Sequence, residues 1–257
     1  MSQSQNQSQN LGEQALSKVA EVAISSQLDQ VEQVNVEVKT DPLKLMQGKL
    51  EGVSIAGEGM VVKQDLRAEA VGVTLDSVAI NPMKAVWGEI ELTEALDAQA
   101  QILLTESDIN RALASDYLRQ KMQQFEVNLN GQPTMFSIQQ AAVQLEQPGQ
   151  IGINLILQPQ NESPKQVSAV AKPCLKDAGR RIDLEILSAE AEGLSLELIM
   201  ALFQEVIGLL DLRNFEFNGS QFQLQDLDIQ PQKMLLRGAV TMEAGSITAA
   251  LNQASQV

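Results

Sequence analysis

LDAQAQILLTESDINRALASDYL, residues 96–118, contains both kinds of secondary structure that the chain uses. From Leu96 to Leu104 apolar residues recur at every second position, the period of a β-strand with one buried face. The period then changes. Thr105 can cap the exposed amides of a helix, and Asp108 lies near its positive end. The stretch predicts a strand that leads directly into a helix.

Alternating runs recur over most of the chain, and turn dipeptides such as Asn130-Gly131 join neighbouring runs. Two-residue turns connect antiparallel strands. The pattern therefore predicts an α+β fold with a long, curved, mainly antiparallel β-sheet and amphipathic helices against its concave face. The clearest of these runs are Val34–Val38, Leu66–Leu75, Ile151–Leu157 and Ile182–Ile186.

Two more amphipathic helices are predicted, one from Gly12 to Gln33 and one that begins after Ser195. Residues 1–10 are mostly Gln, Ser and Asn, which bury too little to fold, so they are predicted to be a disordered polar tail. No change of composition marks a linker, and residues 11–257 are predicted to form a single α+β domain.

The composition argues against several function classes. The chain has no histidine, which removes the usual general base and most transition-metal sites, and Cys174 stands alone. Paired carboxylates such as Asp226 and Asp228 fit a solvated strand edge. A net charge of −15 opposes binding to nucleic acid. We expect no enzyme, no metal and no cofactor.

One phrase, Pro-x-Lys followed by apolar residues and Gly, occurs three times. It lies in TDPLKLMQGKLEG from Thr40, INPMKAVWGEIEL from Ile80 and IQPQKMLLRGAVTM from Ile229. Proline ends a strand ladder and glycine permits a tight bend, so the phrase predicts a repeated structural corner. Trp87 in the second corner either packs there, or it lines an entrance or touches a bilayer interface.

The cluster KPCLKDAGRR, residues 172–181, is the basic exception in an acidic chain. It is either a solvated loop or a head-group contact, with Arg180 as the candidate. The start MSQSQNQSQN lacks the features of a signal peptide, and no apolar run is long enough to span a membrane. We therefore expect a cytoplasmic protein with peripheral, transient contact to a membrane.

Aliphatic side chains are abundant and aromatic residues make up only 3% of the chain. A curved sheet with helices on its concave face can leave an elongated aliphatic groove, which suits acyl chains. The alternative is a fully packed interior and a scaffold function at the surface. The groove candidates on the first and third helices are Leu16, Val19, Ile24, Ile199, Phe203 and Val206.

Three segments resemble the bacterial LmeA-like phospholipid-binding family: residues 12–61 (GEQALSKVAEVAISSQLDQVEQVNVEVKTDPLKLMQGKLEGVSIAGEGMV), 104–118 (LTESDINRALASDYL) and 209–238 (LLDLRNFEFNGSQFQLQDLDIQPQKMLLRG). The resemblance implies a fold related to the tubular lipid-binding proteins, in which a curved sheet wraps a long helix beside an acyl-chain groove. It implies a phospholipid or other lipid as partner, and lipid holding or transfer as the function. It supplies no catalytic motif.

Overall fold

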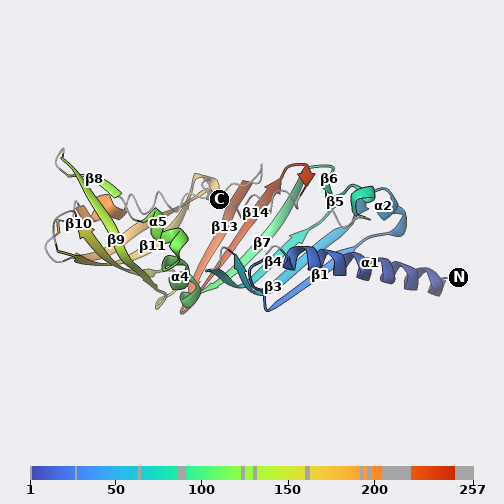
Figure 1. Cartoon of the computed structure of the whole chain (residues 1–257), viewed down its shortest axis with the longest axis horizontal. Coiled ribbons are helices and arrows are strands. Elements are labelled where there is room, and N and C mark those ends of the chain that lie inside the picture. The colour runs from blue at the N-terminus through green and yellow to red at the C-terminus, as the bar shows by residue number, and fades with distance from the viewer. Residues whose placement is uncertain are drawn as a thin grey trace.

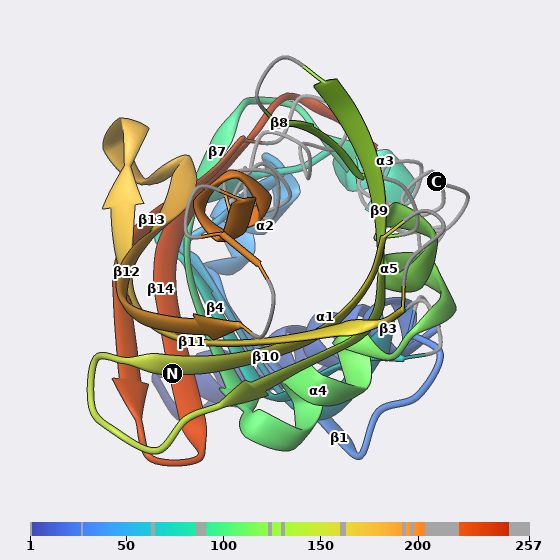
Figure 2. The same cartoon turned by 90° about the vertical axis from the view of Figure 1, so that its left-hand side faces the viewer.

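The protein is described from a computed structural model that covers residues 2–26, 28–62, 65–85, 91–122, 125–129, 132–159, 163–191, 194–195, 198–203 and 221–246. The molecule is elongated, and two β-sheets follow one another along its long axis (Figure 1). Seen along that axis, the strands curve around it rather than lying flat (Figure 2).

All the strand pairs in the two sheets are antiparallel in the part of the chain that the structure describes, which confirms the predicted fold class. The strands form two sheets where the sequence suggested one. The six-stranded sheet has the order β1 (Gln33–Lys39), β3 (Gly52–Val62), β4 (Leu66–Leu75), β7 (Leu96–Thr105), β14 (Lys233–Met242) and β13 (Gln221–Gln230). The five-stranded sheet has the order β12 (Arg181–Ala191), β11 (Lys165–Lys176), β10 (Ile151–Pro159), β9 (Gln132–Gln144) and β8 (Phe125–Leu129).

Short elements connect these strands. Two small ladders pair β2 (Lys49–Leu50) with β5 (Val78–Ala79) and β6 (Glu91–Leu92) with β15 (Gly245–Ser246). The helices are α1 (Ser2–Ser25), α2 (Pro42–Met46), α3 (Pro82–Ala85), α4 (Glu106–Leu113), α5 (Asp116–Lys121) and the 3₁₀ turn η1 (Asp177–Gly179). Residues 198–203 are also helical, and the hydroxyl of Ser195 accepts the Leu198 amide, as the predicted cap requires.

The first two predicted helices have different bounds in the structure. α1 includes residues 2–10, which we predicted as a disordered tail, and it ends at Ser25 before the predicted Gln33. A helix that is already nucleated extends at little cost through residues such as Gln, which are good helix formers. The helix predicted within residues 104–118 is divided into α4 and α5 because Ser115 caps a new turn by accepting the Leu118 amide.

The first two Pro-x-Lys corners are short helices, and the third is a tight turn. Pro42 and Pro82 begin α2 and α3, where a missing amide hydrogen costs nothing. Gly48 has a φ of 74°, and a Cβ there would lie 2.2 Å from the Ile80 carbonyl oxygen. Only glycine fits this close approach. In the third phrase, Pro231 and Gln232 form the link between β13 and β14. The glycine of this phrase, Gly238, lies inside β14.

Two clusters of buried apolar residues hold the described chain together. The cluster beside the five-stranded sheet includes Leu145, Leu157, Val167 and Phe203, each with at most 2% of its surface exposed. The cluster at the α1 end of the six-stranded sheet includes Val36, Leu50, Ile80, Leu92 and Leu96. The described residues therefore form two cores, one towards each end of the long axis (Figure 1).

The turn η1 joins the two sheets. It connects β11 to β12 and contacts β13 of the other sheet. Asp177, Ala178 and Gly179 all have positive φ, and a Cβ on Gly179 would lie 1.8 Å from the Leu224 carbonyl oxygen. Two non-glycine residues in this region are strained, which indicates that the tertiary contact with β13 dictates the backbone here.

Helix α1 covers the outer edge of β1 with side-chain acceptors. Glu13, Ser17 and Glu21 accept the amides of Thr40, Val38 and Val36 at 3.0, 3.1 and 3.4 Å. The spacing fits because four helical residues rise about 6 Å and two strand residues about 6.8 Å. The hydrogen bond from Lys18 lowers the pKa of Glu21, and the Val36 amide acts in the same direction. The helix thereby protects an edge strand that could otherwise pair with another chain.

Replacing Glu13, Ser17 and Glu21 together by Ala should expose this edge. We expect faster hydrogen exchange at the β1 amides and a greater tendency to aggregate, since each lost hydrogen bond contributes about 1 kcal/mol. Val22→Ala is the control, because Val22 lies on the same helix and is 64% exposed. Unchanged exchange at Val36, Val38 and Thr40 in the triple variant would show that the helix does not protect the edge.

Candidate functional site

The middle of the six-stranded sheet carries a row of apolar side chains. Val71 on β4 pairs with Ile102 on β7, and Ile102 pairs with Leu236 on β14. Paired residues on adjacent strands point to the same face of a sheet. All three are half-buried, so solvent still reaches them. We call Val71, Ile102 and Leu236 the central apolar row; its three strands lie side by side in Figure 1.

The central apolar row lies between the two cores, on the same face of the sheet. Along β14, Val240 packs against the core at the α1 end and Met234 against the core of the other sheet, with Leu236 between them. On β4, Val73 likewise belongs to the α1-end core, two residues from Val71. The row itself belongs to neither cluster of described residues. The result is a continuous apolar face that is well covered at both ends and half-covered in the middle.

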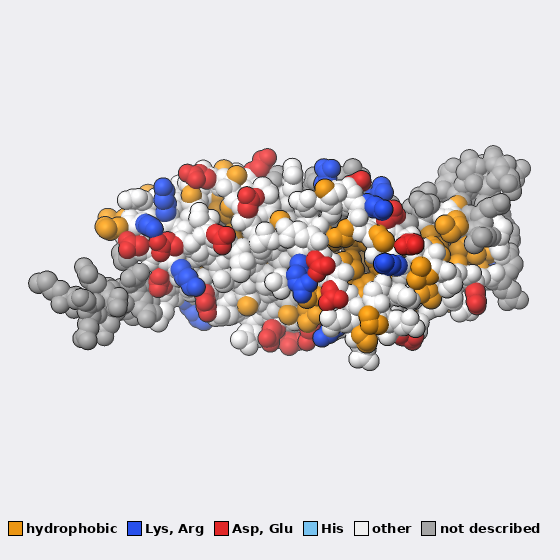
Figure 3. All heavy atoms as spheres, turned by 180° about the vertical axis from the view of Figure 1, so that it is seen from behind, with side chains coloured by type: hydrophobic (Ala, Val, Ile, Leu, Met, Phe, Trp, Pro, Cys, Tyr) orange, Lys and Arg blue, Asp and Glu red, His pale blue; other side chains and the backbone are white. Residues whose placement is uncertain are grey.

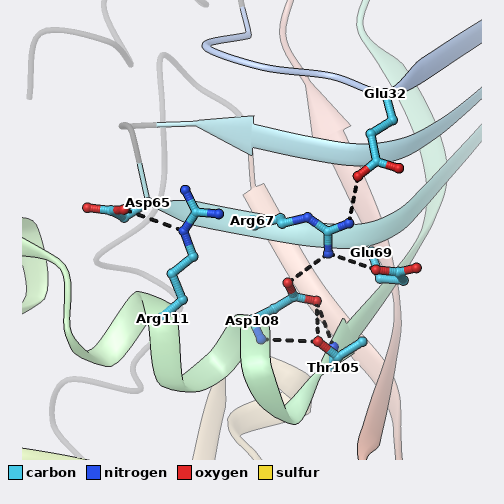
Figure 4. A network of polar contacts seen from close by, with 7 residues as sticks. All are labelled: Glu32, Asp65, Arg67, Glu69, Thr105, Asp108 and Arg111. Carbon is cyan, nitrogen blue, oxygen red and sulfur yellow. Dashed lines mark hydrogen bonds and ion pairs between the residues drawn. The ribbon is translucent and has the colours of Figure 1, made fainter.

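A charged network lies beside this row (Figure 4). Arg67 on β4 donates to Asp108 at 2.8 Å, to Glu69 at 2.7 Å and to Glu32 at 3.0 Å. Asp108 also closes the capping box of α4 with Thr105, and the sequence predicted Thr105 as the cap of this helix. Because three carboxylates already surround Arg67, its guanidinium serves to fix α4 to the sheet and is not available to a ligand.

The network changes the pKa values of its members. Burial by itself raises the pKa of Asp108, but the hydrogen bonds from Thr105 and Arg67 outweigh it, so the pKa lies below its ordinary value. The hydrogen bonds that Arg67 donates to Asp108, Glu69 and Glu32 raise the pKa of its guanidinium. Both groups are therefore charged at neutral pH, and their pairing stabilises the fold there.

Asp108→Asn should lower the free energy of unfolding by about 2 kcal/mol at neutral pH, because a buried charge-assisted interaction is lost. A carboxyl with a depressed pKa contributes stability above its unfolded pKa, and this is lost as pH falls through the folded pKa. The wild type should therefore lose stability below about pH 4 more steeply than the variant. The measurement is urea unfolding over a pH series.

Asp65→Asn is the matched control for this series. Asp65 contacts Arg111 at 3.4 Å, and both side chains are more than 40% exposed. Its loss should change stability by less than about 1 kcal/mol. If both variants behave alike, the Arg67–Asp108 contact does not hold α4 in place.

The structure separates the residues that we predicted to line a groove. Ile199 and Phe203 are 4% and 2% exposed in the core of the five-stranded sheet, whereas Leu16 and Ile24 pack against the core at the other end. Val19 is 46% exposed on α1. These positions stay predictions as lipid contacts, and no single site contains them all.

Of the other predicted positions, Arg180 lies within the described residues. Arg180 is exposed in the loop between β11 and β12, where its Nε donates to the Asp177 carbonyl oxygen at 3.2 Å. Trp87 and Val206 lie outside the described residues. The row itself was missed, although its residues stand in alternating runs, because only the strand register shows that they are neighbours.

Described residues line cavities in at least two places. One of about 460 Å³ lies between α1 and β1, and one of about 110 Å³ lies beside the turn from β9 to β10. Most of the residues around both cavities are polar or charged by type, so neither is the elongated aliphatic groove that we predicted. Within the described part of the chain, no group of His, Cys, Asp and Glu is arranged to hold a metal ion. No described helix is long and apolar enough to cross a membrane.

The fold and the face define a class: an elongated, two-sheet antiparallel α+β protein whose apolar face stays half-covered between two cores. The model of the LmeA-like phospholipid-binding family matches residues 8–239, and the chain belongs to this family. The predicted family membership is thereby confirmed. No curated protein matches the chain. Among solved structures, one similar chain is described as "Crystal structure of lipopolysaccharide binding protein". It is 8% identical, covers 81% of this chain and 87% of its own, and has a TM-score of 0.24, too low to establish a shared fold.

Proposed function

We propose that this protein binds a phospholipid or another acyl-chain lipid along the central apolar row, without catalysing a reaction on it. The observation that most supports lipid binding is the position of Val71, Ile102 and Leu236. They lie on one face of the sheet, half-buried between two cores of buried apolar residues. Family membership supports the same class of ligand.

The chemistry of the row suits an acyl chain. Aliphatic side chains offer dispersion and burial, and each methylene removed from water contributes about 0.8 kcal/mol. A chain of ten or more methylenes could thus gain several kcal/mol from an open face without a closed tunnel. Arg67, on the same strand as Val71, is saturated by carboxylates, so the head group would remain towards solvent.

A lipid held on an open face can leave again, which suits holding or transfer at a membrane surface. The net charge of −15 opposes tight docking on anionic bilayers, so contact with the membrane would be transient. The described groups offer binding rather than turnover, and the family is characterised by binding.

The double variant Ile102→Trp/Leu236→Trp tests the site. Two indole rings would occupy the space of several methylenes, and we expect lipid occupancy to fall about tenfold or more. The matched control is Leu103→Trp/Leu235→Trp. Leu103 and Leu235 pair with each other on the same two strands, are equally half-buried, and point to the opposite face.

Occupancy is measured by native mass spectrometry, followed by organic extraction and by uptake of a fluorescent phospholipid. We expect a bound lipid in the wild type and in the control, but not in the row variant. A wild-type protein that carries no lipid and takes up none would favour a fully packed scaffold and contradict the proposal. Equal loss in both variants would contradict the position of the site.

A further inference from the structure

The corners α2 and α3 lie against each other. The Ile80 amide donates to the Gly48 carbonyl oxygen at 2.7 Å, and β2 pairs with β5 directly beside them. A Cβ on Gly48 would approach the Pro82 ring at 3.0 Å. Two separate copies of the Pro-x-Lys phrase thus form one structural unit. We call residues 42–48 and 80–85 the corner tip.

The corner tip carries the three most exposed large hydrophobic side chains of the described residues. Leu43, Met46 and Met83 are 71%, 80% and 72% exposed. Leu45 on the same short helix packs against the core, so the corner is anchored while its neighbours face outwards. Single exposed apolar residues need no explanation, but three on adjoining corners form an interaction surface. Hydrophobic side chains beside basic ones are visible at this end of the molecule, on the left of Figure 3.

The backbone of the tip is satisfied internally. The Asp41 carboxylate accepts the Leu43 amide at 2.8 Å, and the Asn81 side chain accepts the Met83 amide at 3.1 Å. At each of the two corners, a side-chain oxygen thus accepts the backbone amide of an exposed apolar residue. Peptide groups that already have partners can enter an apolar interface at low cost.

The charge of the tip differs from that of the whole chain. Residues 42–48 and 80–85 contain Lys44 and Lys84 and no Asp or Glu, whereas the chain as a whole carries −15. Lys44 pairs with Glu51, and Lys84 lies 3.3 Å from Glu91. Long lysine stems can lie along apolar surface while their ammonium groups reach phosphate oxygens. The tip is therefore a place where an acidic protein can approach a lipid head-group layer with little repulsion.

We infer that the corner tip docks on a lipid bilayer surface, with Leu43, Met46 and Met83 entering the interface and the lysines at head-group level. Separate flexible side chains on two short helices suit a fluid interface, which needs no complementary shape. The inference rests on the proposed lipid binding, since it gives the protein a place to load or release its lipid. The tip and the central apolar row are different residues and can be changed independently.

The test is flotation with vesicles of phosphatidylcholine containing a minor fraction of phosphatidylglycerol. Leu43→Ser/Met46→Ser/Met83→Ser should weaken vesicle binding about tenfold or more, because three side chains no longer leave water. The control Val62→Ser/Leu187→Ser changes two other exposed apolar residues, 40% and 48% exposed, and should bind vesicles like the wild type. All changed side chains are exposed, so the fold should be retained, which circular dichroism verifies.

Two further measurements distinguish a failure of the proposed docking surface from a failure of the proposed lipid site. Native mass spectrometry should find lipid still bound to the tip variant, whereas Ile102→Trp/Leu236→Trp should lose its lipid yet still float with vesicles. Vesicle binding that is equal in the tip variant and the wild type would overturn the docking surface without affecting lipid binding. Dimers of the wild type that the tip substitutions dissociate would overturn it as well, because the tip would then bind a second copy of the chain.

Discussion

The apolar face of the six-stranded sheet has to be covered, and the described residues cover it from both ends but only halfway in the middle. One core ends near Val73 and Val240, and the other begins near Met234. Between them, the register of β4, β7 and β14 places Val71, Ile102 and Leu236 in one row. A ligand that covers this half-buried aliphatic row removes more apolar surface from water and thereby gains binding free energy. The proposed function depends on this gain.

The remaining structure keeps this face in place. α1 protects the β1 edge through side chains spaced four residues apart, so the sheet does not extend into another molecule. The contact between Arg67 and Asp108 fixes α4 beside the row, and η1 holds the five-stranded sheet to β13. Each of these contacts uses polar groups that are satisfied within the fold, and the apolar face between the two cores stays half-covered.

Local patterns in the sequence predicted much of the fold. The alternation of Leu96 to Leu104 and the Thr105–Asp108 cap gave a strand and a helix start that the structure confirms, because both depend on neighbours in the chain. The division into two sheets could not be predicted, since it depends on which strands pair. The start of α1 was also wrong, because helix extension depends on a packed segment further along the chain.

The site was less predictable than the fold. Helical periodicity identified Ile199 and Phe203 as apolar but could not show how deeply each is buried, and they are 4% and 2% exposed. Leu236 is separated from Ile102 by most of the chain, and only antiparallel register makes them neighbours. The Pro-x-Lys repeat predicted three similar corners, whereas two of its copies begin short helices and the third forms a tight turn. Nothing local showed that the first two corners touch.

The most direct test places a lipid on the protein and reads out individual side chains. A phospholipid with a nitroxide along its acyl chain is added to protein with isotope-labelled methyl groups, and paramagnetic broadening is measured by NMR. The account predicts strong broadening of the methyl signals of Val71, Ile102 and Leu236, and little at Leu103 and Leu235 on the opposite face of the same strands. Equal broadening of the two faces, or none at the row, would contradict it.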